Sequence, residues 1–124
     1  MKKIKITILG LGYVGLPLAI AFGKKYDVLG YDKDKKRIKE LKMFYDSNGE
    51  HKKNIIKNSK YLKFTYDISD LKASNIFILT LPTPIYKNKK PDLSIINHAN
   101  KSIGKILKKD DIVVYESTVY PGAT

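Results

Sequence analysis

Apolar segments alternate along this chain with amphipathic and polar ones. Short apolar runs that fit buried strands cover residues 4–9, 28–31, 62–66, 75–81 and 111–116. Apolar residues spaced three and four apart predict helices over residues 13–22, 33–42 and 94–108, with brief helical turns at residues 54–58 and 69–72. Because strands that alternate with helices form parallel sheets, we expect an α/β fold with a doubly wound parallel sheet of about five strands.

The ends of several predicted elements also carry capping signals. Ser69 or Asp70 is expected to cap the brief helix near residue 70, and Asp92 or Ser94 to cap the long helix that runs to Lys108. The apolar stripe of that long helix predicts an inward face made of Ile95, Ile96, Ala99, Ile103 and Leu107.

The first apolar run leads directly into a glycine-rich turn, residues 10–15. Gly10 allows a tight turn, Gly12 lets the backbone approach a pyrophosphate, and Gly15 lets the next helix pack against the sheet. That helix directs free N–H groups and its positive dipole end at the phosphates. Asp32 ends the second apolar run, about 20 residues on, where a carboxylate binds the ribose 2′-OH. The pattern predicts a Rossmann-like dinucleotide site; the alternative is a turn whose glycines serve only packing.

The cations after Asp32 bear on which dinucleotide binds. Lys33, Lys35, Lys36 and Arg37 would tolerate a 2′-phosphate, whereas Asp32 favours an unmodified ribose. We therefore expect NAD rather than NADP. The alternative for Asp32 is that it caps a helix that begins at Lys33.

Length and composition limit the classes of protein to consider. The 124 residues fit one domain with a real core. No stretch of 18 residues is apolar, so we expect no membrane-spanning segment and no membrane partner. The chain contains no cysteine, which excludes disulfides and thiolate metal sites within it and fits a cytoplasmic protein.

The net charge of +12 raises the question of nucleic-acid binding. Arg37 is the single arginine among 24 basic residues, and the lysines are spread along the whole chain. Because arginine is the preferred bidentate reader of bases and phosphates, we expect a solvated lysine-rich surface and no nucleic-acid partner. His51 and His98 have no partners at metal or triad spacing, so we expect surface or helix-face histidines and no metal site.

Three polar clusters follow the predicted strands at their carboxyl ends. They are the glycine turn at residues 10–15, the segment Leu81-Pro82-Thr83-Pro84, and the segment Glu116-Ser117-Thr118. Ligands of open parallel sheets bind outside the carboxyl ends of the strands. We therefore expect the three clusters to converge on one site.

With these clusters in place, the chain resembles the N-terminal domain of the UDP-glucose/GDP-mannose dehydrogenase family. The matching pieces occur in the family's order: Gly10-Leu-Gly-Tyr-Val-Gly-Leu-Pro17, Leu81-Pro-Thr-Pro84, Pro91-Asp-Leu93 and Glu116-Ser-Thr-Val-Tyr-Pro-Gly122. The last segment looks most like the branch that oxidises UDP-N-acetyl-hexosamines for surface polysaccharides. Family members oxidise the C6 alcohol of a nucleotide sugar to a carboxylate with two NAD⁺, which implies a UDP-sugar substrate.

The resemblance implies a role for each matching position. It assigns backbone contacts with the pyrophosphate to Gly12, Tyr13 and Val14, the adenosine ribose to Asp32, and the adenine side to Arg37. It assigns the nicotinamide end to Pro82, Thr83 and Ser117, and placement of the catalytic water to Thr118. The alternatives are that Thr83 is only a loop hydroxyl and that Thr118 only caps a helix.

The resemblance also implies parts that this chain does not contain. The family's second oxidation uses a catalytic cysteine, and dimerisation uses a central helix; both lie beyond position 124 in the family. We therefore expect residues 1–124 to be the NAD-binding domain of a longer, homodimeric enzyme that binds NAD but does not complete the reaction alone. A full domain of this family adds a sixth strand beside the fifth, and we expect residues 1–124 to lack it. Residues 112–115 are then expected to form an apolar sheet edge that self-associates.

Two other functions remain open from the sequence alone. One is a different two-domain NAD-dependent dehydrogenase, of the 6-phosphogluconate or 3-hydroxyacyl-CoA type, although such enzymes lack the second and third clusters. The other is a regulatory domain that binds NAD(H) as a signal.

Overall fold

A computed structural model of the chain describes residues 3–80 and 94–116. Its elements, in chain order, are β1 (Lys5–Leu9), α1 (Gly15–Phe22), β2 (Asp27–Tyr31), α2 (Lys35–Lys42), α3 (Lys53–Lys57), β3 (Leu62–Thr65), the 3₁₀ helix η1 (Ile68–Ala73), β4 (Ile76–Leu79), α4 (Ser94–Gly104) and β5 (Ile112–Tyr115). The strands form one five-stranded sheet in the order β3-β2-β1-β4-β5, and every pairing is parallel. The predicted doubly wound α/β sheet of five strands is confirmed.

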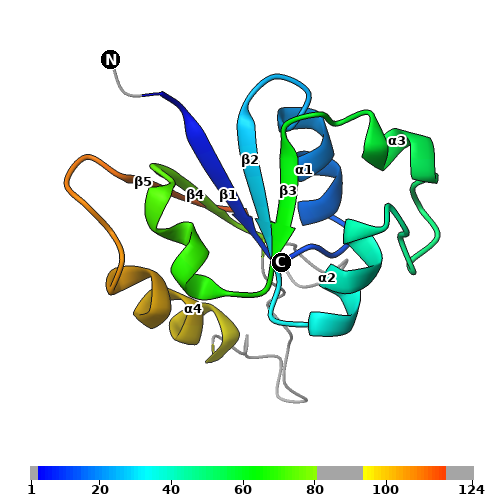
Figure 1. Cartoon of the computed structure of the whole chain (residues 1–124). Helices are drawn as coiled ribbons and strands as arrows, with labels where there is room; N and C mark the ends of the chain where they lie inside the picture. The colour runs from blue at the N-terminus through cyan, green and yellow to red at the C-terminus, as the bar shows by residue number, and fades with distance from the viewer. Residues whose placement is uncertain (1–2, 81–93, 117–124) are drawn as a thin grey trace, which may run out of the picture.

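Strand β1 lies at the centre of the sheet and pairs with β2 on one side and β4 on the other. In register, Ile8 lies opposite Gly30 of β2 and Ile78 of β4. The chain moves outward from β1 in one direction through β2 and β3, then returns to the other side for β4 and β5 (Figure 1). This reversal beside β1 is the topological switch point, where α/β sheets bind ligands.

The sheet has a separate hydrophobic core on each face. Alternate side chains of a strand point to opposite faces, so Ile78 joins the core under α1, α2 and α3, while Phe77 and Leu79 join the core on the opposite face. Ile103 of α4 and Leu71 of η1 complete that second core. Figure 1 shows the same division, with α1 to α3 on one side of the strands and α4 on the other.

Helix α4 ends four residues earlier than the sequence predicted. It ends at Gly104, where the low helix propensity of glycine permits a turn, and the N–H groups of Ile106 and Leu107 both donate to the carbonyl of Ile103. As a result, Ile106 packs against the core and Leu107 is 41% exposed, so the inward position predicted for Leu107 is wrong. Ala99 and Ile103 do face the core, whereas the side chains of Ile95 and Ile96, and Asp92, lie outside the described part.

Two predicted helix starts are also corrected. Asp34, not Asp32, caps α2, because its carboxylate accepts the N–H groups of Lys36 and Arg37. The cap of η1 is Asp67, which accepts the N–H of Ser69, rather than Ser69 or Asp70. In both cases the carboxylate that precedes the first turn satisfies N–H groups that the helix leaves free.

Strand β5 forms one edge of the described sheet. Its side chains are largely exposed, with Ile112 at 53% and Tyr115 at 56%. The predicted apolar edge is therefore present in the described residues, and its self-association stays a prediction. None of the described helices is long and apolar enough to cross a membrane.

Gly15 marks the closest approach of α1 to the sheet. A Cβ atom at this position would overlap the carbonyl oxygen of Gly10 and the hydroxyl of Thr80. The helix can approach its own turn this closely only because Gly15 has no side chain.

We expect Gly15→Ala to lower the free energy of unfolding by about 3 kcal/mol, because backbone must shift to relieve the overlap. Gly104→Ala is the matched control, since a Cβ there meets no atom within 4 Å. Urea denaturation followed by circular dichroism measures both variants. Equal midpoints for Gly15→Ala and the unchanged chain would show that the turn accommodates a side chain.

Candidate functional site

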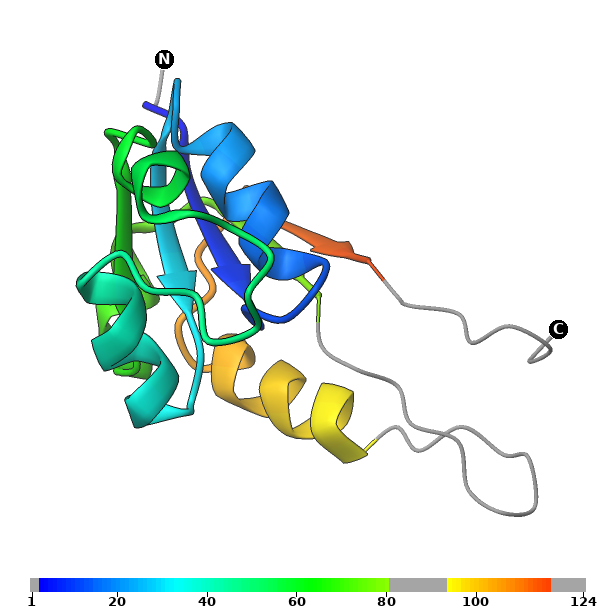
Figure 2. The ribbon, with the colours of Figure 1, turned by 90° about the vertical axis from the view of Figure 1, so that its right-hand side faces the viewer.

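The glycine turn lies at the carboxyl edge of the sheet, between β1 and α1. Figure 2 shows the arrowheads of β1 and β2 pointing to this edge, from which the chain enters α1. Gly10 has φ +97°, a backbone conformation that residues with a Cβ atom rarely adopt. Its N–H donates to the carbonyl of Tyr31 at 2.9 Å. The tight turn predicted at Gly10 is confirmed.

The next part of the turn is open to a ligand. A Cβ at Gly12 would meet no atom within 4 Å, and Tyr13 is 67% exposed. No described side chain caps the N-terminus of α1 at Val14. The exposed backbone of Gly12 and Tyr13, with the positive end of the helix dipole behind it, therefore faces space that an anion can enter. This arrangement fits a pyrophosphate.

Thr80 supports the turn from the neighbouring strand. Its Oγ1 lies 2.6 Å from the carbonyl oxygen of Gly10 and 3.0 Å from that of Leu9, and the residue is buried. The hydroxyl donates its proton to these carbonyls, and the carbonyl of Leu9 also accepts the N–H of Thr80 at 2.9 Å. The sequence analysis did not identify Thr80 as a site residue; its signal was a hydroxyl at the end of an apolar strand.

Asp32 is fixed at the end of β2 by two backbone N–H groups. Its Oδ2 accepts from the N–H of Leu11 and its Oδ1 from the N–H of Asp34, each at 3.0 Å. Each carboxylate oxygen has a second lone pair that these bonds leave free. Asp32 is therefore held next to the glycine turn with acceptors for a ribose hydroxyl, and the residues present fit the adenosine half of a dinucleotide.

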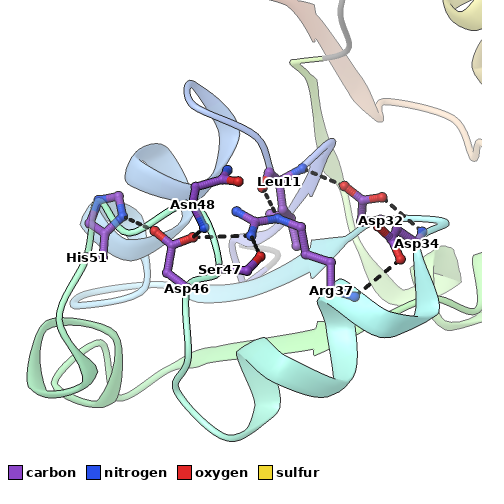
Figure 3. Close-up of polar contacts among 8 residues, drawn as sticks. All are labelled: Leu11, Asp32, Asp34, Arg37, Asp46, Ser47, Asn48 and His51. Atoms are coloured by element: carbon purple, nitrogen blue, oxygen red, sulfur yellow. Dashed lines mark hydrogen bonds and ion pairs between the residues drawn. The ribbon is translucent and has the colours of Figure 1, made fainter.

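Arg37 also contacts Leu11, the residue of the turn whose N–H bonds to Asp32. Its Nε donates to the carbonyl of Leu11 at 2.6 Å, and its Nη1 lies 3.2 Å from Oδ1 of Asp46 and 3.4 Å from the hydroxyl of Ser47 (Figure 3). Only 11% of the Arg37 side chain is exposed. The sequence placed Arg37 near the adenine, and the structure places it beside the turn, already bonded to protein groups.

Asp46 is a second residue that the sequence analysis missed. Its side chain is 1% exposed and also accepts from the N–H of Asn48 at 3.0 Å and contacts Nδ1 of His51 at 3.1 Å. His51 is therefore not the surface histidine that was predicted; 17% of its side chain is exposed. Burial alone would raise the pKa of Asp46, but the hydrogen bonds from His51, Asn48 and Arg37 lower it below the usual value.

The structure brings together seven of the predicted site residues: Gly10, Gly12, Tyr13, Val14, Gly15, Asp32 and Arg37. Pro82, Thr83, Ser117 and Thr118 lie outside the described residues, so their roles stay predictions. Within the described ranges, no cluster of His, Cys, Asp and Glu side chains has the arrangement of a metal site. What the described residues can do chemically is bind the ADP half of a dinucleotide.

The lowered pKa of Asp46 predicts a specific dependence of stability on pH. A carboxylate with a lowered pKa stabilises the fold above its unfolded pKa, and this stabilisation is lost as the pH falls through the folded value. Asp46→Asn should therefore cost about 3 kcal/mol near pH 7, and the cost should shrink as the pH falls below the ordinary aspartate pKa of about 4.

Chemical denaturation of the unchanged chain and of Asp46→Asn across this pH range measures the difference. Asp67→Asn is the control. The pKa of Asp67 is also lowered, first by the Ser69 hydroxyl, but Asp67 is exposed, so this variant removes a lowered pKa without removing a buried ion pair. Parallel stability curves for the unchanged chain and Asp46→Asn would contradict the role assigned to the carboxylate.

Comparison with known proteins gives a consistent result. The family model described as the UDP-glucose/GDP-mannose dehydrogenase family, NAD binding domain, matches residues 4–124. The UDP-N-acetyl-D-glucosamine 6-dehydrogenase of Pseudomonas aeruginosa is 53% identical over all 124 residues, which cover 29% of its length. Protein CapL of Staphylococcus aureus is 50% identical over 96% of this chain and 28% of its own.

A solved structure agrees with these sequence relatives. The UDP-D-ManNAc dehydrogenase of Pyrococcus horikoshii superposes with a TM-score of 0.81 at 36% identity, over 98% of this chain and 30% of that one. The chain thus spans less than a third of the length of the relatives it matches. On its glycine turn, its fold and the family match together, this chain belongs to the UDP-glucose/GDP-mannose dehydrogenase family and corresponds to its NAD-binding domain.

Proposed function

We propose that this chain serves as the NAD-binding domain of a nucleotide-sugar 6-dehydrogenase. The substrate is a UDP-N-acetyl-hexosamine, whose C6 alcohol is oxidised to the uronic acid for surface polysaccharide synthesis. The observation that carries this proposal is the 53% identity, over the whole chain, with a UDP-N-acetyl-D-glucosamine 6-dehydrogenase. The geometry of the turn supports it, since Asp32 suits the ribose and the open N-terminus of α1 suits the pyrophosphate of an ADP group.

Each site residue has a place in this proposal. Gly10 and Gly15 shape the turn, and Gly12, Tyr13 and Val14 present backbone to the pyrophosphate. Asp32 binds the adenosine ribose, with Arg37 on the adenine side. NAD supplies the acceptor for the hydride that leaves the sugar. The nicotinamide end falls to Pro82, Thr83 and Ser117, and placement of the catalytic water to Thr118.

The remaining parts of the function belong to the longer protein. We infer that residues 1–124 are one domain of a longer, homodimeric protein that carries the sugar-nucleotide and dimerisation parts outside these residues. The 28–30% coverage of the relatives supports this division. The cytoplasmic location stays a prediction of the sequence.

Calorimetric titration with NAD⁺ tests the site directly. Asp32→Ala should weaken NAD⁺ binding about 10- to 100-fold, because it removes a charged acceptor from the ribose and the anchor of Leu11. Asp27→Ala is the matched control: Asp27 lies at the opposite end of the same strand, where it pairs with Lys3 in solvent. Equal affinity of Asp32→Ala and the unchanged chain would refute the ribose assignment.

A chimera tests the activity of the whole enzyme. This chain would replace the matching residues of the Pseudomonas aeruginosa relative, and UDP-N-acetyl-D-glucosamine oxidation would be followed by NADH absorbance. We expect activity, and we expect Thr118→Val in the chimera to lower kcat about 100-fold with little change in the KM for NAD⁺. An inactive chimera that still binds NAD⁺ would count against the proposed substrate, and unchanged kcat in Thr118→Val against the role of Thr118.

A further inference from the structure

The start of α2 presents a conflict between charge and cofactor. Four cationic side chains follow Asp32 within five residues: Lys33, Lys35, Lys36 and Arg37. Cations at this position usually accommodate the 2′-phosphate of NADP. The chain nevertheless belongs to an NAD-binding family. Its structure must therefore prevent these cations from strengthening the binding of a 2′-phosphate.

Arg37 is the cation whose position matters most. Its Nε binds the carbonyl of Leu11, while the carboxylate of Asp32 binds the N–H of the same residue. Arg37 and the proposed ribose-binding residue Asp32 therefore both contact Leu11. Arginine is also the side chain best suited to bidentate phosphate binding. By contrast, Lys33 and Lys36 are exposed, where solvent and salt screen their charge, and the Nζ of Lys35 lies 5.3 Å from the ring centroid of Tyr66.

The guanidinium of Arg37 is held by the Leu11 carbonyl at Nε and by the carboxylate of Asp46 at Nη1. Among the described residues, Asp46 is the only carboxylate that forms an ion pair with Arg37. The carboxylate itself is held by the N–H of Asn48 and by His51, so it forms a fixed, buried anchor. Figure 3 shows the guanidinium turned toward Asp46 and Ser47 and away from Asp32.

We propose that Asp46 is a positioning residue that sets the choice of dinucleotide, because it holds the guanidinium of Arg37 away from the place of a 2′-phosphate. This inference rests on the proposed binding of the adenosine ribose at Asp32. The Nη2 of Arg37 is buried and has no hydrogen-bond partner among the described residues. Without Asp46, the guanidinium would carry an uncompensated charge in a buried place. It would then turn outward, where a 2′-phosphate offers charge-assisted hydrogen bonds.

Dissociation constants for NAD⁺ and NADP⁺, measured by calorimetry on the same preparations, test the inference. Asp46→Asn, which keeps the shape of the side chain, should shift the NADP⁺ to NAD⁺ affinity ratio about tenfold toward NADP⁺. The double variant Asp46→Asn/Arg37→Met should return the ratio to that of the unchanged chain, because Asp46 acts only through Arg37. Ser47→Ala is the matched control: it removes the 3.4 Å contact and keeps the ion pair, so its ratio should stay within about twofold.

The outcomes separate this inference from the proposed function. A folded Asp46→Asn that binds NAD⁺ with an unchanged ratio would overturn the inference and leave the NAD site standing. An unchanged chain that binds neither dinucleotide would overturn both. If Asp46→Asn gives no cooperative melting, Arg37→Met alone decides: an unchanged ratio supports the withdrawn guanidinium, and a selective loss of NADP⁺ affinity overturns it.

Discussion

The structure depends on how the backbone of two consecutive residues, Gly10 and Leu11, is satisfied where the chain leaves β1. A reversal this tight takes their N–H and C=O groups out of the strand pairing, except for the Gly10 N–H, which still bonds to Tyr31 of β2. Buried backbone groups without partners are costly. Partners come from three other elements: Tyr31 and Asp32 at the end of β2, Arg37 on α2, and Thr80 after β4. The turn is therefore shaped by tertiary contacts, and its glycines only make that shape sterically possible.

The parallel sheet explains why these partners are available. In register, Leu9 lies opposite Tyr31 and Leu79, so the residues that follow β1, β2 and β4 emerge side by side at one edge. Asp32 and Thr80 each come directly after one of these strands. A shift of β2 by one residue against β1 would turn Asp32 to the wrong face, and the same shift of β4 would turn Thr80. The same alternation that buries Ile78 and Phe77 in opposite cores thus also places the binding groups.

The sequence predicted what depends on local pattern and missed what depends on long-range packing. The strands, the glycine turn and Asp32 follow from periodicity and fixed spacing, and the structure confirms their places. The end of α4 was wrong because apolar spacing continues to Leu107 although the backbone turns at Gly104. Asp46 was missed, and the prediction for His51 was wrong, because both lie in a polar, aperiodic segment where Asp46 meets Arg37 only through the fold.

The contrast between the lysines and the single arginine shows that net charge alone does not identify the charges that shape the site. All but one of the 24 basic residues behind the net charge of +12 are lysines, yet those beside Asp32 reach into solvent, where their individual effect is small. Arg37 contributes one charge and is largely buried, where it joins the turn at Leu11 to the segment that contains Asp46. Desolvation strengthens the electrostatic interactions of a buried group, so this one pair constrains the site more than the surface charge does. The effect of a charge on this turn therefore depends on where the fold holds it, rather than on how many charges the sequence contains.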